Sequence, residues 1–266
     1  MGNILAIAKK ELRISFTTVT AYAVMTVFAL ITAFFFLQLV SFYQMQSTQF
    51  MSMGGQAAQM LEHMNFNDQV ITPLFSNIQV FFLFLIPMMT MRLLADEQRM
   101  KTMQLLMTTP VRPIEIVLGK YIAAAVLIAT MLGITILFPL ILQVYGAGDA
   151  GKGVIDWRSV MTGYLGLFLV GAAFVAIGLF TSSVTDSAFV AVALSFGAGL
   201  LLRVVGWAGI GKEGFWHDLP TYLSLLNHLE GFAKGVIRLP DLIYYASLIV
   251  LGLFLTHRMV EAQRWR

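Results

Sequence analysis

The chain has 266 residues, of which 58% are hydrophobic and only 12% are charged. Soluble globular domains carry roughly 25% charged residues, so this composition excludes a soluble protein and indicates a chain solvated by lipid. The formal net charge of +3 is too small to indicate nucleic-acid binding. The absence of cysteine excludes disulfides, thiolate chemistry and Cys-based zinc sites.

The segment 3–16 is predicted to form an amphipathic elbow helix. Leu5, Leu12 and Phe16 recur at helical spacing on one side, and such a helix lies along the inner membrane interface before the chain enters the bilayer. No cleaved signal is predicted, because the following apolar run is too long for a signal peptide. The charged residues of this elbow helix are Lys9, Lys10, Glu11 and Arg13.

Six stretches are long and apolar enough to cross a bilayer. A helix rises ~1.5 Å per residue, so about 20 apolar residues span the ~30 Å hydrocarbon layer. Charge-free intervals place the spans near 20–42, 73–91, 117–145, 160–180, 186–206 and 241–257. The fold class is therefore an all-α membrane protein, with residues 1–266 forming a single transmembrane domain.

The distribution of basic residues predicts the orientation. If both termini are cytoplasmic, the inner segments hold 11 of the 17 Lys and Arg residues and the outer segments hold 6. Loops richer in Lys and Arg stay in the cytoplasm. Both termini and the segment 92–120 are therefore expected on the cytoplasmic side.

The first outer loop is rich in methionine and is predicted to be helical near 56–63. Thioethers are ligands that select Cu(I), so a copper site is one interpretation. Packing of flexible Met side chains on the membrane surface is the preferred alternative. The residues concerned are Met45, Met51, Met53, Met60, His63 and Met64.

The glycine-rich segment 146–153, GAGDAGKG, resembles a phosphate-binding P-loop only in part. Gly153 stands where a P-loop has the Ser or Thr that holds magnesium, and the segment follows a membrane span instead of a strand. It is predicted to be a flexible outer loop. The four histidines lack the spacing of a metal site and are expected at surface or interfacial positions: His63, His217, His228 and His257.

An outer amphipathic helix is predicted between Pro220 and Pro240, before the last span. Its apolar face would be formed by Leu225, Leu229, Phe232 and Val236. Its polar face would be formed by Asn227, Glu230, Lys234 and Arg238, with Glu230 and Lys234 at the favourable i,i+4 spacing.

No ionisable residue occupies the middle of a predicted span. Asp186 and Arg203 fall near the ends of the fifth span, so the spans do not indicate an ion pathway. Small residues at four-residue spacing are expected to let helices approach closely, within the chain or between two copies. They are Ala172 and Ala176, and Ser195 and Gly199.

The segment 92–120 interrupts two apolar runs with a concentration of charge. Leu94 and other apolar residues lie among the charges, Pro110 breaks the run, and Pro113 is predicted to start a second helix that enters the membrane. A solvated loop is one interpretation. A helix, break and helix that present a rigid surface to a partner is the other.

At this segment the sequence resembles the type-2 ABC exporter permeases. The residues that carry the resemblance are ADEQRMKTMQLLMTTPV (95–111), EIVLGK (115–120) and the elbow segment AKKELR (8–13). The outer LNHLEGFAKGVI (226–237) is similar to the branch that includes gliding-motility-associated permeases. Lys101 stands where the family usually has Gly, and Gln98 and Gln104 replace commonly charged positions.

The resemblance implies a permease subunit that couples ATP hydrolysis by two separate nucleotide-binding ATPase subunits to export or to work on the cell envelope. The chain would bind no cofactor or metal and would not be an enzyme itself; ATP and magnesium would sit on the partner. It would pair with a second copy in the bacterial inner membrane, and an accessory periplasmic or membrane-anchored protein is a possible further partner. The implied coupling residues are Asp96, Glu97, Arg99, Lys101, Thr102, Leu105, Leu106 and Pro110.

Other function classes have less support. A secondary transporter should carry buried charges or paired broken helices near the midplane, and neither is evident in the sequence. A non-transporting, ATP-driven envelope or motility component is compatible with the same spans. A membrane enzyme ranks last, because no nucleophile, base and orienting group can be placed together. The sequence does not identify a substrate.

Overall fold

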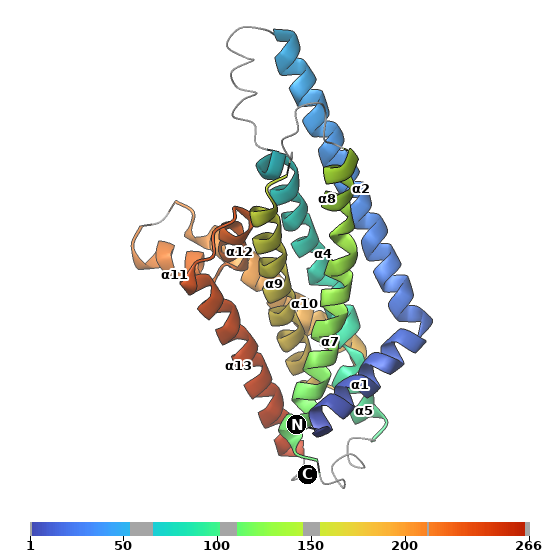
Figure 1. The fold of residues 1–266 in the computed structure, drawn as a ribbon. Coiled ribbons are helices and arrows are strands. Elements are labelled where there is room, and N and C mark those ends of the chain that lie inside the picture. The colour runs from blue at the N-terminus through green and yellow to red at the C-terminus, as the bar shows by residue number, and fades with distance from the viewer. Residues whose placement is uncertain (1, 54–65, 102–110, 146–154, 212, 264–266) are drawn as a thin grey trace.

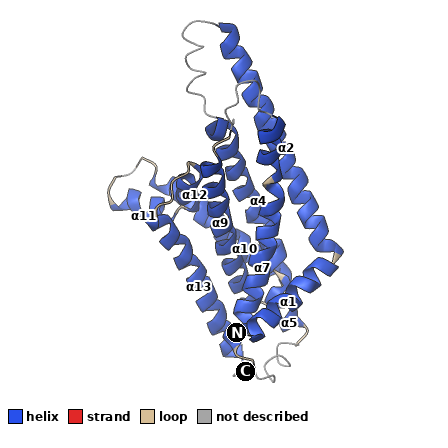
Figure 2. Cartoon of the chain, in the orientation of Figure 1, coloured by secondary structure: helices blue, strands red, loops and turns tan. Residues whose placement is uncertain are grey.

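The computed structural model describes residues 2–53, 66–101, 111–145, 155–211 and 213–263. In these residues it contains helices, turns and loops and no strand (Figure 2). The Met-rich segment predicted to be helical near 56–63 and the glycine-rich segment 146–153 lie outside the described residues. Of the Met cluster only Met45, Met51 and Met53 are placed, in the last turns of one long helix.

Six helices of the described residues are long and apolar enough to cross a membrane. They are Ala21–Ser52, Asn67–Arg99, Pro113–Val144, Trp157–Val184, Ala188–Gly209 and Leu239–Gln263. Their main elements are α2 (Val19–Met53), α4 (Thr72–Thr90), α7 (Pro113–Thr135), α9 (Trp157–Val184), α10 (Ala188–Val204) and α13 (Leu239–Gln263). Each overlaps one of the six predicted ranges, because long charge-free runs can satisfy their backbone groups in lipid only as helices. The prediction of an all-α membrane protein with six spanning helices is confirmed.

Short elements extend these helices. The π-helical turn η1 (Asn67–Ile71) leads into α4, and α5 (Arg92–Arg99) follows it. α8 (Leu137–Tyr145) continues α7, and the 3-10 helix η2 (Val205–Gly209) continues α10. The N-terminal α1 (Gly2–Thr17) matches the predicted elbow helix. Figure 1 shows that α1, α5 and both ends of the chain lie at the same end of the molecule.

α9 is the central helix of the bundle, and 72% of its most apolar 18-residue stretch is buried. It packs against α4, α7, α10, α12 (Leu225–Ala233) and α13 (Figure 1). Glycines bring these neighbours close: a Cβ at Gly163 would overlap Phe75 of α4, and one at Gly166 would lie 2.7 Å from the Cβ of Phe232. Small residues are what membrane helices use for close approach.

The predicted small-residue contacts occur within the chain. Ala172 and Ala176 of α9 are buried, and a Cβ added to Gly252 of α13 would lie 2.9 Å from that of Ala176. Ser195 of α10 is buried, and a Cβ at Gly199 would lie 2.6 Å from the ring of Phe174. These residues therefore set the spacing of α9, α10 and α13.

The outer segment before α13 differs from the single helix that the sequence predicted. It forms two helices, α11 (Phe215–Leu223) and α12, separated by Ser224 in an extended conformation. Pro220 lies inside α11, where it removes only one backbone donor from a helix that ends three residues later. α12 ends at Ala233 because Gly235 turns the chain with a φ of 81°. Val236 is consequently outside the helix and 47% exposed.

His228 is another correction, because the expectation of a surface or interfacial position is wrong for this histidine. Its side chain is buried in α12. Its Nδ1 lies 2.6 Å from Asp241 Oδ1 of α13, and its Nε2 lies 2.8 Å from the carbonyl oxygen of Tyr222. Its ring also stacks on Tyr244, with the centroids 4.0 Å apart. The imidazole therefore ties α11, α12 and α13 together.

Candidate functional site at the junction of α1, α5 and α7

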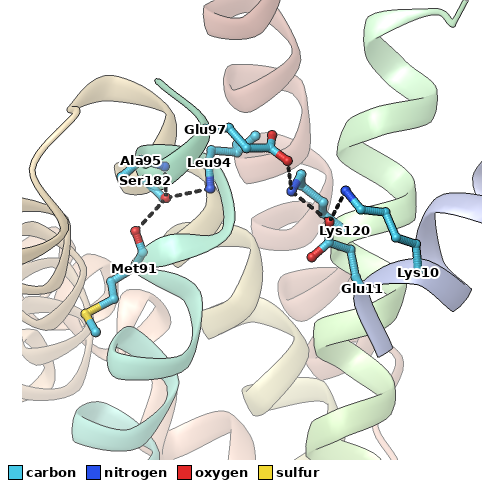
Figure 3. A network of polar contacts seen from close by, with 8 residues as sticks. All are labelled: Lys10, Glu11, Met91, Leu94, Ala95, Glu97, Lys120 and Ser182. Atoms are coloured by element: carbon cyan, nitrogen blue, oxygen red, sulfur yellow. Dashed lines mark hydrogen bonds and ion pairs between the residues drawn. The ribbon is translucent and has the colours of Figure 1, made fainter. Parts of the chain in front are cut away.

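The junction begins with a kink between α4 and α5, to which Ser182 of α9 contributes. Ser182 Oγ accepts from Leu94 N at 3.1 Å and Ala95 N at 3.0 Å, and it donates to the Met91 carbonyl at 2.9 Å (Figure 3). In a continuous helix these amides would bond carbonyls four residues earlier. A side chain inserted into this ladder is a recognised cause of helix kinks. Ser182 thus sets the direction in which α5 leaves the bundle.

A backbone carbonyl of α9 joins α5 to the C-terminal helix, α13. The Ser183 carbonyl accepts from Gln98 Nε2 of α5 at 2.9 Å and from Gln263 Nε2 of α13 at 3.3 Å. Gln98 is neutral where the sequence resemblance implies a charge, and its amide donates to a backbone carbonyl. α5 is therefore anchored on the end of α9 at two successive residues, Ser182 and Ser183.

Lys120 of α7 is the centre of the junction. Its side chain is only 3% exposed, and its Nζ lies 2.8 Å from Glu97 Oε1 of α5 and 3.1 Å from Glu11 Oε1 of α1 (Figure 3). Lys10 Nζ lies 3.6 Å from the same Glu11 oxygen and stays largely exposed. One buried ammonium thus connects α7 with α5, 23 residues away, and with the N-terminal α1, 109 residues away.

The starts of α1 and α7 are joined by a second contact. Glu115 Oε2 accepts from the backbone amide of Arg112 at 3.0 Å, which caps α7, and from Asn3 Nδ2 at 3.2 Å. Pro113 is the first residue of α7, as the sequence predicted. Close packing supports these bonds, because a Cβ at Gly119 would lie 2.7 Å from Ile7 Cγ2 of α1. Residues 3 to 11 of α1 therefore pack against residues 115 to 120, in the first turns of α7.

The implied coupling residues do not all face the same way. Asp96 is partly exposed, 4.0 Å from Arg92, whereas Arg99 and Lys101 are exposed. Glu97 points inward to Lys120. Thr102, Leu105, Leu106 and Pro110 lie outside the described residues.

Lys101 adopts a left-handed conformation with a φ of 56° just after the end of α5. This conformation favours glycine because a Cβ meets steric resistance there. Lys101 therefore makes a backbone turn that glycine would make with less steric resistance.

The charged residues of the elbow helix α1 also face in different directions. Glu11 faces Lys120 in the junction, while Lys9, Lys10 and Arg13 are exposed. The break after α1 is stabilised by Thr18 Oγ1, which donates to the Ile14 carbonyl. The elbow helix thus has one internal charge and an outer basic surface.

The outer polar residues belong to a different region. Glu230 and Lys234 form the predicted i,i+4 ion pair, and the hydrogen bond that Lys234 donates to the Glu230 carboxylate raises the pKa of the Lys234 ammonium. Asn227 donates to the Thr221 carbonyl at 3.1 Å and connects α12 to α11. These residues do not contribute to the junction.

Sequence reasoning found the charged segment but missed the internal pairing. Ser182 carried no signal, because a serine at the end of an apolar helix is common. Lys120 was counted with the cytoplasmic basic residues, although the Gly119–Lys120 pair of the resemblance could have indicated a special position.

The family comparison covers most of the chain. Residues 5–214 match the family model described as "ABC-2 family transporter protein". Among curated proteins, no sequence matches the chain. The match includes α1, α5, Ser182 and Lys120, so the junction lies inside the family region. The chain belongs to the ABC-2 transporter family and is a multi-pass permease subunit of an ABC transporter.

Proposed function

We propose that this permease acts as an exporter subunit of the bacterial inner membrane, driven by ATP hydrolysis on a separate nucleotide-binding subunit. Two copies of the chain pair with two ATPase subunits, and the substrate path lies between the copies. Both termini and α5 face the cytoplasm. The bias of basic residues supports this orientation, as does the shared location of α1, α5 and both chain ends (Figure 1).

The contact that carries the proposal is the ammonium of Lys120 between Glu97 and Glu11. ATP-driven closure of the partner would displace α5, together with residues 102–110 that follow it. Because α5, α7 and α1 share one buried cation, a displacement of α5 would move all three. α1 leads directly into α2, so the elbow would convert that displacement into tilting of the first span.

The exposed charges of α5, together with Lys101 just after it, are the proposed contacts to the ATPase. Asp96, Arg99 and Lys101 are accessible, whereas Glu97 would act from within the chain by holding Lys120. Reversal of Asp96 and Glu97 together would mix the loss of an interface with the loss of the junction. The two residues therefore need separate variants.

The experiment is ATPase stimulation in the purified complex with its co-purifying ATPase. Asp96→Lys is expected to lower permease-stimulated hydrolysis at least about tenfold, since like charges across an interface cost several kcal/mol. Membrane insertion and the thermal midpoint should not change, because within the described residues the Asp96 side chain makes only a long contact with Arg92. Arg258→Glu, on an exposed charge of α13, is the matched control. Normal stimulation by Asp96→Lys would contradict the proposed interface.

Mechanical work on the envelope is a second candidate output, favoured by the similarity of residues 226–237 to the gliding-motility branch. Deletion of the gene distinguishes the two outputs. Export predicts accumulation of a solute or lipid in the cell, whereas envelope work predicts loss of surface motility without accumulation.

A further inference from the structure

Arg203 is a cation within a membrane-spanning helix that the coupling junction does not involve. It lies near the end of α10 and is half-buried, and its Nη1 donates to Gln79 Oε1 of α4 at 3.0 Å. Gln79 is 1% exposed. A charged side chain in an apolar span costs free energy, so the groups that compensate the charge of Arg203 indicate the function of this position.

The described residues supply no opposite charge to Arg203. No carboxylate among them lies within ion-pair distance, and its single hydrogen bond goes to the neutral amide of Gln79. The Nε2 of that buried amide has no hydrogen-bond partner in the described part of the chain. The guanidinium has five N–H donors in a planar fork. Most N–H donors of Arg203 and Gln79, and the positive charge of Arg203, therefore have no acceptor or counter-charge among the described residues.

The surroundings of the pair are apolar and closely packed on one side only. One turn away, a Cβ at Gly199 would lie 2.9 Å from Leu83 Cδ2, and the rings of Phe84 and Phe196 lie 4.9 Å apart. In contrast, only 17% of the most apolar stretch of the span Ala188–Gly209 is buried, so the described residues leave most of the surface of α10 uncovered. A ligand could reach Arg203 from that side, and the low dielectric would strengthen its charge–charge attraction.

We propose that Arg203 and Gln79 form a binding site for an oxyanion of the phosphate or carboxylate type. The guanidinium fork would bind two oxygens, which is the geometry that Arg forms with these groups, and the Gln79 amide would orient the fork. A lipid headgroup and a water-soluble anion supply the same chemistry. This site goes beyond the proposed function and does not depend on the ATPase interface.

The test measures thermal unfolding of the purified full chain in an uncharged detergent. The probes are phosphatidylglycerol, a phosphate-free uncharged glycolipid, and inorganic phosphate. Wild type should be stabilised by phosphatidylglycerol, by inorganic phosphate, or by both, and not by the glycolipid. A response to the lipid alone identifies a headgroup site, and a response to inorganic phosphate identifies a site for soluble anions.

Two variants and one control make the test specific. Arg203→Gln should raise the probe concentration needed for half of the shift at least about tenfold, because the variant loses the positive charge and the charge-assisted hydrogen bonds to the probe. Gln79→Glu should raise the midpoint without any probe and abolish the response, since its carboxylate would occupy the guanidinium. Arg238→Gln, on an exposed cation at the start of α13, should respond like wild type.

The responses of the two variants decide whether the site exists. Loss of the response in both variants with Arg238→Gln intact supports the site. An unchanged response in either variant, or no response of wild type to either anionic probe, overturns it.

Discussion

Lys120 keeps its ammonium group where water hardly reaches it, and two carboxylates from other helices replace the lost hydration. Such a buried group is stable only while its partners stay in place, since an uncompensated buried charge is strongly destabilising. The exposed neighbour Lys10 is the natural comparison, because it contacts the same Glu11 at the surface. Exposed pairs contribute little to stability.

We predict that Lys120→Met lowers the free energy of unfolding by about 3–5 kcal/mol, because it removes the buried ammonium that the carboxylates of Glu11 and Glu97 share. The triple change Lys120→Met, Glu11→Gln and Glu97→Gln should recover much of this loss. Lys10→Met should cost less than about 1 kcal/mol. Denaturant unfolding of the purified chain in detergent measures all three. Equal losses for Lys120→Met and Lys10→Met would contradict the junction.

At the scale of the element, the start of α9 depends on one carboxylate. Asp156 accepts from Ser159 Oγ at 2.8 Å and from Arg158 N at 3.0 Å, and these hydrogen bonds lower the pKa of the Asp156 carboxyl. Ser, Thr, Asp and Asn at this position satisfy backbone donors that the first helical turn leaves free. The central helix of the bundle therefore begins with a charged cap.

The lowered pKa gives a pH dependence with a defined sign. The stabilisation by Asp156 is fully present above the pKa of the unfolded chain, about 4, and is lost as pH falls through the lower pKa of the folded protein. Asp156→Ala should cost about 1 kcal/mol at neutral pH, whereas Asp156→Asn should keep most of the cap and lose this part of the acid sensitivity. Thermal midpoints between neutral pH and pH 3 measure both, and identical acid profiles for wild type and Asp156→Asn would refute the assignment.

The outer helices show how tertiary contacts redirect an amphipathic segment. The apolar positions Leu225, Leu229 and Phe232 are buried as their spacing predicted, because α9 offers Gly166 as a surface for them. The predicted helix boundaries at Pro220 and Pro240 were wrong, because Ser224 and Gly235 interrupt the helical conformation instead. The burial of His228 was missed because its partner Asp241 is 13 residues away.

For the whole molecule, the orientation in the membrane can be tested directly because the chain contains no cysteine. Arg238 and Arg258 are exposed residues near opposite ends of α13. We predict that Arg258→Cys in intact cells is protected from a membrane-impermeant maleimide, while Arg238→Cys is labelled. Both should be labelled after the cells are opened. Labelling of Arg258→Cys in intact cells would reverse the proposed orientation.

The sequence by itself determined the membrane class, the six spans, the elbow helix near 3–16 and the helix start at Pro113. Charge-free length decides whether a helix can cross lipid, and local chemistry decides where many helices begin. Only the tertiary structure decided that Glu97 faces Lys120 and that Ser182 kinks the chain before α5. Those contacts join residues 23 and 88 positions apart, and no local pattern specifies such pairing. It depends on how the six helices pack around α9.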